Sequence, residues 1–151
     1  MAFHRDFTDF TNEIDAPAGE IFAFFKRIEE WPSWTRAIRK TKRTDTGDWR
    51  VGYRFTMHAS FAPAIPLRIT MHEYEEHRLI GWGVKWPLGL LTVIHRFHFE
   101  PLGPGRCRIR NHEFAEGLLA PLMVPLKGMI DRFDRQWADD LEAKFRKRNA
   151  A

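Results

Sequence analysis

The C-terminal part of the chain carries one apolar stripe, and this stripe most constrains the fold. Between residues 119 and 145, apolar side chains recur every three or four positions, which places them on one face of an α-helix. They are Leu119, Leu122, Leu126, Met129, Ile130, Phe133, Trp137, Leu141 and Phe145. Because proline disrupts a helix interior, Pro121 and Pro125 predict that the regular helix begins at or after Pro125, or that its first turns are kinked. A long helix with one apolar face needs a partner that covers this face.

The partner is predicted to be an antiparallel β-sheet. Residues 3–14 have the alternation of a strand, and Pro17 precedes a short amphipathic helix predicted over residues 18–30, ending at Trp31 and Pro32. Six further β-rich runs, separated by short Pro- and Gly-containing turns, cover residues 36–44, 51–60, 67–74, 79–85, 91–100 and 107–115. Short links favour antiparallel pairing, so we expect one α+β domain over residues 1–151.

Composition and charge exclude several classes of protein. With 151 residues and thirteen Phe, the chain is expected to bury one core. A single cysteine, Cys107, leaves no internal disulfide and favours a reducing cytoplasm. Neither a signal peptide nor a membrane-spanning run is evident. The net charge of +4 comes without any nucleic-acid-binding motif, so we expect no nucleic-acid partner.

Several short segments, in order, resemble one superfamily. They include residues 14–17 before a helix, the Trp31-Pro32-Ser33-Trp34 segment, residues 100–105 before Arg108, and residues 113–117 before the last helix. Over about 130 residues this order is similar to the polyketide cyclase/dehydrase and lipid-transport branch of the START/Bet v 1-like (SRPBCC) superfamily. The resemblance implies a helix-grip fold: a seven-stranded curved antiparallel sheet around a long C-terminal helix, two short helices after the first strand, and a ligand cavity. It implies no particular reaction.

Inward-facing apolar residues are candidates for the cavity wall. Strand alternation and the helical stripe select Phe55, Met57, Met71, Trp82, Val84, Phe97, Ile109, Leu126, Met129, Ile130 and Phe133. For any one of them, ordinary core packing is the simpler interpretation. The hypothesis is therefore that these residues together form the cavity wall, and it assigns ligand contact to no single one of them.

Three polar residues are predicted on the inner faces of the last two strands: His95, Asn111 and Glu113. Burying them without partners is costly, so they either bond one another and a water, or orient a ligand and exchange a proton with it as catalytic residues. A β-bulge at His112 would turn His112 inward in place of Glu113.

Three connecting segments are unusually apolar for loops, which normally carry polar residues. They supply the candidate rim residues Phe61, Ile65, Trp86, Leu88 and Leu122. We expect them to surround one opening of the cavity as a lid or as a transient membrane contact; alternatively, they close the end of the sheet or form a homodimer contact. Monomer and homodimer both remain open.

No metal or nucleotide cofactor is predicted. The spacing of His72 and His77 departs from the zinc-protease signature, and no glycine-rich phosphate-binding motif occurs. The function predicted is binding of an apolar small molecule, such as a polyketide, lipid, isoprenoid or aromatic metabolite. The alternative is an aromatase/cyclase-like enzyme that uses His95 and Glu113, and a third possibility is a protein whose rim binds another chain.

Overall fold

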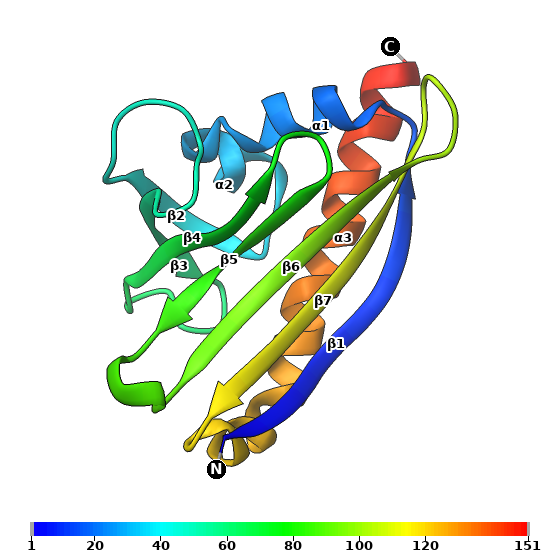
Figure 1. Cartoon of the computed structure of the whole chain (residues 1–151). Coiled ribbons are helices and arrows are strands. Elements are labelled where there is room, and N and C mark those ends of the chain that lie inside the picture. Colours follow the sequence, from blue (N-terminus) through cyan, green and yellow to red (C-terminus); the bar gives the residue numbers. More distant parts are fainter. Residues whose placement is uncertain (1, 151) are drawn as a thin grey trace.

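A seven-stranded antiparallel sheet wraps around a long C-terminal helix in the computed structural model, which describes residues 2–150 (Figure 1). The spatial strand order is β1-β7-β6-β5-β4-β3-β2. The strands are β1 (Phe3–Ile14), β2 (Ile38–Arg43), β3 (Arg54–Ala59), β4 (Leu67–Glu75), β5 (Leu79–Lys85), β6 (Thr92–Pro101) and β7 (Cys107–Gly117). The predicted helix-grip fold is therefore confirmed.

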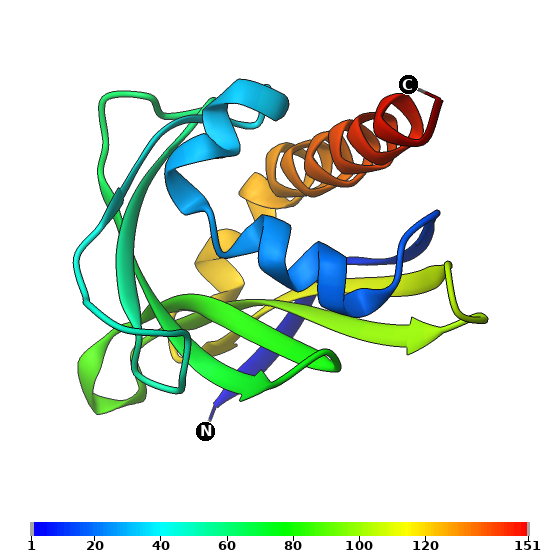
Figure 2. The same cartoon turned by 90° about the horizontal axis from the view of Figure 1, so that it is seen from above.

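The C-terminal helix begins where the prolines allow it. Residues Ala120–Leu126 form a 3₁₀ segment, η3, and the α-helix α3 follows over Lys127–Ala150. Its buried face carries Ile130, Trp137, Leu141 and Phe145, as the apolar stripe predicts. The sheet curves around α3 and the short helices, as the view from above shows (Figure 2).

The two short helices that the resemblance implies are present after β1, but their bounds differ from those predicted from periodicity. Helix α1 (Ala18–Phe25) ends early, a 3₁₀ turn η1 spans Ile28–Glu30, and α2 (Trp31–Trp34) begins at the dipeptide that was expected to end a helix. Pro32 occupies the first turn of α2, where its missing N–H breaks no helical hydrogen bond. The expectation of one helix over residues 18–30 is therefore wrong in extent.

The core beneath α1 and α2 is mostly aromatic. Trp31 and Trp137 have ring centroids 5.0 Å apart, and both lie against the sheet residue Trp82. Phe25 packs edge-on against Trp137 at 5.3 Å. These rings fill the half of the concave face nearer to α1.

A β-bulge interrupts β1. Its pairing with β7 shifts between Asp6 and Thr8, so that Phe7 and Thr8 are both buried while Asp6 and Asp9 are exposed. The pairing of β6 with β7 is regular, and His95 lies opposite Glu113. The bulge considered at His112 is therefore absent from β7.

Candidate functional site

The other half of the concave face forms a partly open cavity of about 190 Å³ between the sheet, η3 and α3. Its lining is apolar except for His95 and Glu113. The lining residues are Met57, Phe61, Leu67, Ile69, Trp82, Gly83, Val84, Val93, His95, Glu113, Met123, Leu126, Met129, Ile130 and Phe133. This volume is several times that of one water.

Gly83 permits the close approach of β5 and β6 at the cavity wall. A Cβ atom added there would lie 1.8 Å from the carbonyl oxygen of Val93, far inside any real contact distance. The sheet can take this path only because residue 83 has no side chain.

The predicted wall residues fall into two groups. Met57, Trp82, Val84, Leu126, Met129, Ile130 and Phe133 line the cavity. Phe55, Met71, Phe97 and Ile109 are fully buried in the main core instead. The second group packs with the aromatic residues of α1 and α2, for example Phe55 against Trp31 at 5.4 Å.

A polar cluster lies at one side of this apolar cavity. His95 Nδ1 lies 3.5 Å from Glu113 Oε2 and 3.3 Å from Asp134 Oδ1. The side chains of His95, Glu113 and Asp134 are only 7%, 13% and 0% exposed. They come from β6, β7 and α3, so that the cluster joins both layers of the fold.

The bulge in β1 gives the cluster a fourth member. The Thr8 hydroxyl donates a hydrogen bond of 2.7 Å to Asp134 Oδ2 and accepts one of 3.2 Å from the backbone N–H of Glu113. The His95 ring stacks on Phe97 with the ring centroids 4.0 Å apart, and this contact restricts rotation of the imidazole ring. Within residues 2–150, His95 Nε2 and Asp134 Oδ1 have no hydrogen-bond partner.

Burial favours the uncharged form of all three titratable groups. It raises the pKa of Glu113 to about 7 and raises the pKa of Asp134 well above its usual range, the latter with help from the neighbouring Glu113 charge. It lowers the pKa of His95, although the Asp134 charge opposes this effect. Near pH 7 the cluster can therefore both donate and accept protons.

Asp134 and Thr8 were not among the predicted site residues. Asp134 lies on the apolar face of α3, four residues after Ile130 and three before Trp137, so an acidic residue within the apolar stripe was the available signal. Thr8 gave no such signal, because the bulge that aims it at Asp134 is not evident in the sequence. The third predicted polar residue, Asn111, donates a 2.7 Å hydrogen bond to Asn12 and is not part of the cavity lining.

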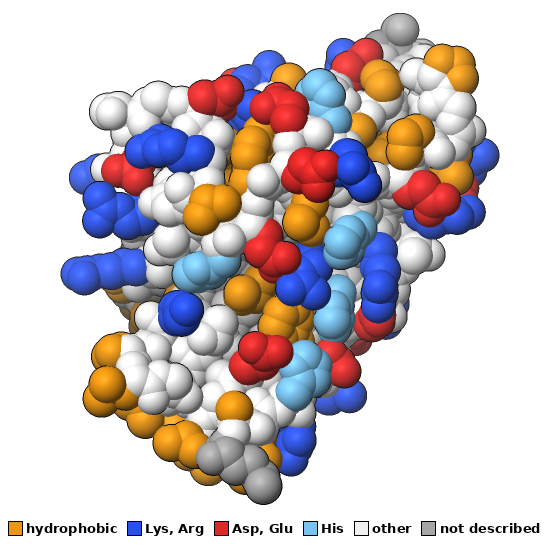
Figure 3. All heavy atoms as spheres, viewed as in Figure 1, with side chains coloured by type: hydrophobic (Ala, Val, Ile, Leu, Met, Phe, Trp, Pro, Cys, Tyr) orange, Lys and Arg blue, Asp and Glu red, His pale blue; other side chains and the backbone are white. Residues whose placement is uncertain are grey.

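The apolar connecting segments lie at one end of the fold. The backbone N–H groups of Leu118 and Leu119 donate to the carbonyls of Gly89 and Leu90, which joins the start of η3 to the β5–β6 loop. Phe61 from the β3–β4 loop packs on Phe133 at 5.4 Å. Figure 3 shows hydrophobic side chains gathered at the lower end of the molecule, where Figure 1 places the β5–β6 loop and η3.

Most of the predicted rim residues are strongly exposed. Leu88 is 92% exposed, Leu122 71%, Ile65 57% and Trp86 50%, whereas Phe61 is 39% exposed and lines the cavity. Leu88 also has a positive φ of 59°, which costs energy for a non-glycine residue. Among the helices described, none is both long and apolar enough to span a bilayer.

Residues 8–146 match the sequence family described as "Polyketide cyclase / dehydrase and lipid transport". The chain belongs to this family. The resemblance inferred from short segments is thereby confirmed for nearly the whole sequence. No curated protein sequence matches the chain significantly.

Solved structures share the fold of this family member at low sequence identity. A START superfamily protein from Mycobacterium smegmatis is 18% identical, with a TM-score of 0.70 over 93% of this chain and 97% of that chain. The major latex-like protein 151 of Panax ginseng is 14% identical, with a TM-score of 0.69 and coverages of 95% and 97%. The di-domain ARO/CYC StfQ from the steffimycin biosynthetic pathway is 16% identical, with a TM-score of 0.68 over 95% of this chain and 46% of that chain.

Proposed function

We propose that this protein binds a compact apolar small molecule in the cavity between the sheet and α3. The observation that carries the proposal is the cavity of about 190 Å³, apolar except for His95 and Glu113. Small-molecule sites commonly combine apolar walls with a few polar groups that fix orientation, and commonly measure about 300–1,000 Å³. The smaller volume here favours a compact ligand, or the leading end of a longer one.

The polar cluster favours a ligand with one polar group. Glu113 lines the cavity, and its pKa of about 7 lets the carboxyl group donate or accept a hydrogen bond near neutral pH. A ligand hydroxyl or carbonyl that reached His95 or Glu113 would gain a hydrogen bond in an apolar setting. A hydrocarbon without such a group would leave these atoms without a partner.

A cavity-filling substitution tests the binding. Val84 lines the cavity and Val51 is 63% exposed, so Val84→Phe and Val51→Phe add the same atoms inside and outside the site. Calorimetric titration with 2-naphthol, a compact apolar probe with one hydroxyl, is expected to show saturable binding by the wild type and Val51→Phe. Val84→Phe is expected to weaken it at least tenfold.

The same titration identifies the polar contact. Glu113→Gln is expected to change the affinity for 2-naphthol more than the affinity for naphthalene, which lacks the hydroxyl. Native mass spectrometry of freshly purified protein should also find a small molecule bound. Equal affinity of Val84→Phe and Val51→Phe for 2-naphthol would contradict the proposal.

An acid/base enzyme is the second candidate, and the His95–Glu113–Asp134 cluster is the observation that favours it. Aromatase/cyclase chemistry moves protons as a reactive chain closes into a ring and loses water. A carboxyl group whose pKa lies near 7, as that of Glu113 does, suits both proton donation and proton abstraction. The cluster lies beside the cavity, where one ligand atom could reach both His95 and Glu113.

Turnover separates the enzyme from the carrier. A short poly-β-ketone thioester, incubated with the wild type, is expected to lose one water if the protein is a cyclase and to be recovered unchanged if it only binds. His95→Ala and Glu113→Gln should abolish the loss of water. Water loss at the same rate in both variants would contradict a role for the cluster.

We further propose that the exposed rim of Ile65, Trp86, Leu88 and Leu122 contacts an anionic membrane surface transiently while ligand enters. The exposed side chains of Lys85, next to Trp86, and Lys127, five residues after Leu122, would favour anionic lipid. We also propose a cytoplasmic location. Proteins of oxidising compartments commonly carry disulfides, whereas the single cysteine of this chain, Cys107, offers no internal disulfide.

Flotation with phosphatidylglycerol-containing vesicles tests the membrane contact. Wild type is expected to float with these vesicles, and Trp86→Asp is expected to float much less. Equal flotation would rule out the membrane contact. Light scattering on the same protein preparations, before vesicles are added, tests the alternative that the rim is a homodimer contact.

A further inference from the structure

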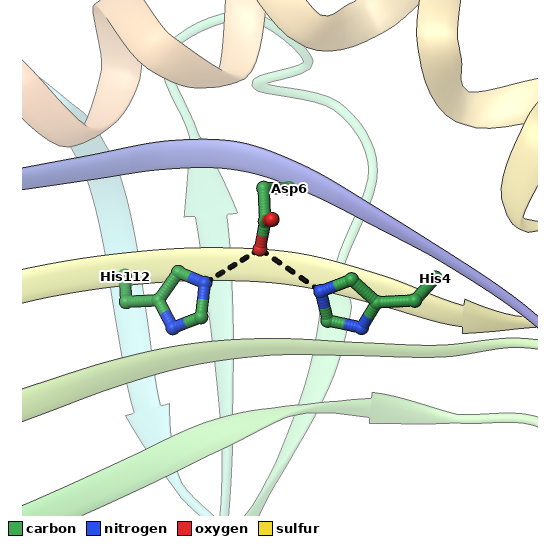
Figure 4. A group of neighbouring side chains, drawn as sticks. All are labelled: His4, Asp6 and His112. Atoms are coloured by element: carbon green, nitrogen blue, oxygen red, sulfur yellow. Dashed lines mark hydrogen bonds and ion pairs between the residues drawn. The ribbon is translucent and has the colours of Figure 1, made fainter.

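We propose that His4, Asp6 and His112 form a binding site for Zn²⁺ or a similar divalent transition-metal ion on the outer face of the sheet (Figure 4). His4 and Asp6 come from β1 and His112 from the adjacent strand β7. The cavity lies on the opposite face of the sheet. This site is therefore separate from the proposed ligand site and does not depend on it.

The three candidate ligand atoms already converge. Asp6 Oδ1 lies 2.6 Å from His112 Nε2 and 2.9 Å from His4 Nε2, and the ligand atoms of all three residues lie within 4.8 Å of one another. Zinc binds histidine nitrogen and carboxylate oxygen at about 2.0–2.2 Å, which places tetrahedral ligand atoms roughly 3.3 Å apart. To admit an ion, each of the two contacts to Asp6 Oδ1 would lengthen by about half an ångström, and the two ring nitrogens would come to a similar separation from each other.

A second carboxylate orients one of the rings. His4 Nδ1 lies 3.1 Å from Glu116 Oε1, while His4 Nε2 faces Asp6. Histidine ligands of metals usually donate their other ring N–H to a carboxylate or carbonyl, which fixes the tautomer and strengthens the ligand. Glu116 supplies this support from the strand that also carries His112.

Phe114 restricts the motion of both rings. Its ring stacks with His4 at a centroid distance of 5.2 Å and lies 5.0 Å from the ring of His112. Histidine side chains also gather on this outer face of the sheet in Figure 3. Holding the two imidazoles in place reduces the entropy that metal binding would otherwise cost.

The ligand types select the ion. Two imidazole nitrogens and one carboxylate suit zinc and neighbouring transition metals, whereas Mg²⁺ and Ca²⁺ prefer all-oxygen sites. Asp6 is 57% exposed, so water can complete the coordination. The ion would act as a structural clamp between β1 and β7, next to the bulge that positions Thr8.

The sequence did not suggest this site. The histidine pair that the sequence pattern offers, His72 and His77, consists of near neighbours in the chain. His112 and Asp6 are 106 residues apart and meet because β1 pairs with β7. The expectation that the protein has no metal site is thus revised by this proposal.

Zinc titration of the untagged full-length chain, after treatment with a chelator, tests the site. Calorimetry is expected to show one saturable Zn²⁺ site, and a zinc concentration 100 times the dissociation constant should raise Tm by roughly 5–10 °C. Glu116→Gln is expected to weaken binding about 10–100-fold. Mg²⁺ should produce no saturable heat.

Matched histidine variants locate the ion. His4→Ala and His112→Ala should each remove saturable binding, while His77→Ala, which alters another exposed histidine, should bind as the wild type does. Circular dichroism checks that each variant is folded; because His4 is 47% exposed, its variant remains informative if His112→Ala fails to fold. Unchanged binding in His4→Ala, or no saturable heat in the wild type, would overturn the proposal.

Discussion

His95 Nδ1 on β6 lies 3.3 Å from Asp134 Oδ1 on α3, and this contact joins the sheet to the helix beside the cavity. Both side chains are almost completely buried. Buried titratable groups destabilise a fold unless they are paired or neutral, so they commonly mark functional positions. The pair is therefore the feature beside the cavity that simple core packing explains least.

Glu113 should make stability fall as pH rises. Its pKa is about 7 in the folded protein, against an ordinary value of 4.5, so the folded state holds the proton more tightly than the unfolded chain does. The resulting stabilisation is present below pH 4.5 and is lost as pH rises to about 7. It amounts to about 3 kcal/mol in total.

Glu113→Gln removes this titration, which makes it the reference for the wild type. In urea unfolding, the free energy of the variant relative to wild type should increase between pH 4.5 and pH 7. His95, whose lowered pKa favours the fold at higher pH, is present in both proteins. The difference therefore reports Glu113 together with its charge effect on Asp134, which raises the pKa of Asp134 and acts in the same direction. A difference that does not vary with pH would show that Glu113 titrates normally.

Thr8→Val should destabilise the protein by about 1–3 kcal/mol, because Asp134 Oδ2 then loses its hydrogen bond inside the fold. Valine keeps the shape of threonine, so that packing changes little. Thr11→Val, an exposed position on the same strand, should change the free energy of unfolding by less than about 0.5 kcal/mol. Equal effects of the two substitutions in urea unfolding would contradict the role of Thr8.

Much of the fold could be predicted from periodicity, while the division of the concave face could not. The stripe from Leu119 to Phe145 and the strand alternation placed α3 and the sheet correctly. How far α1 and α2 reach under the sheet depends on three-dimensional packing of Phe25, Trp31 and Trp137. Phe55 and Phe97 therefore lie in the packed half, whereas Val84 and Met129 line the cavity.

For a similar reason, only two of the four residues of the polar cluster could be predicted from the sequence. His95 and Glu113 follow from strand alternation, because neighbouring inner positions on paired strands face each other. Asp134 needs the rotation of α3 against the sheet, and Thr8 needs the bulge after Asp6. Contacts between distant segments of this kind carry no local sequence pattern.

Gly83→Ala should destabilise the protein by about 3 kcal/mol or prevent folding, because its Cβ would overlap the Val93 carbonyl. Gly128 is the matched control. A Cβ there meets nothing within 4 Å, and alanine favours helix, so Gly128→Ala should stabilise α3 by about 0.5–1 kcal/mol. Thermal unfolding measures both, and a well-folded Gly83→Ala would contradict the close approach of β5 and β6.

Leu88→Gly should stabilise the fold while weakening the membrane contact. The Leu88 side chain is 92% exposed and its φ is 59°, so glycine relieves backbone strain and loses little packing. We expect a gain of about 0.5–1 kcal/mol in urea unfolding. Vesicle flotation should fall in the same variant, and undiminished flotation would remove Leu88 from the proposed contact.

The most direct test is to locate a bound probe by NMR. With 2-naphthol added to the wild-type protein, we expect intermolecular NOEs to the methyl groups of Met57, Met129 and Ile130, which line the cavity from both layers. NOEs confined to Leu88 and Leu122 on the exposed rim, or none to any methyl group under saturating probe, would contradict the claim that the space between sheet and helix receives a ligand.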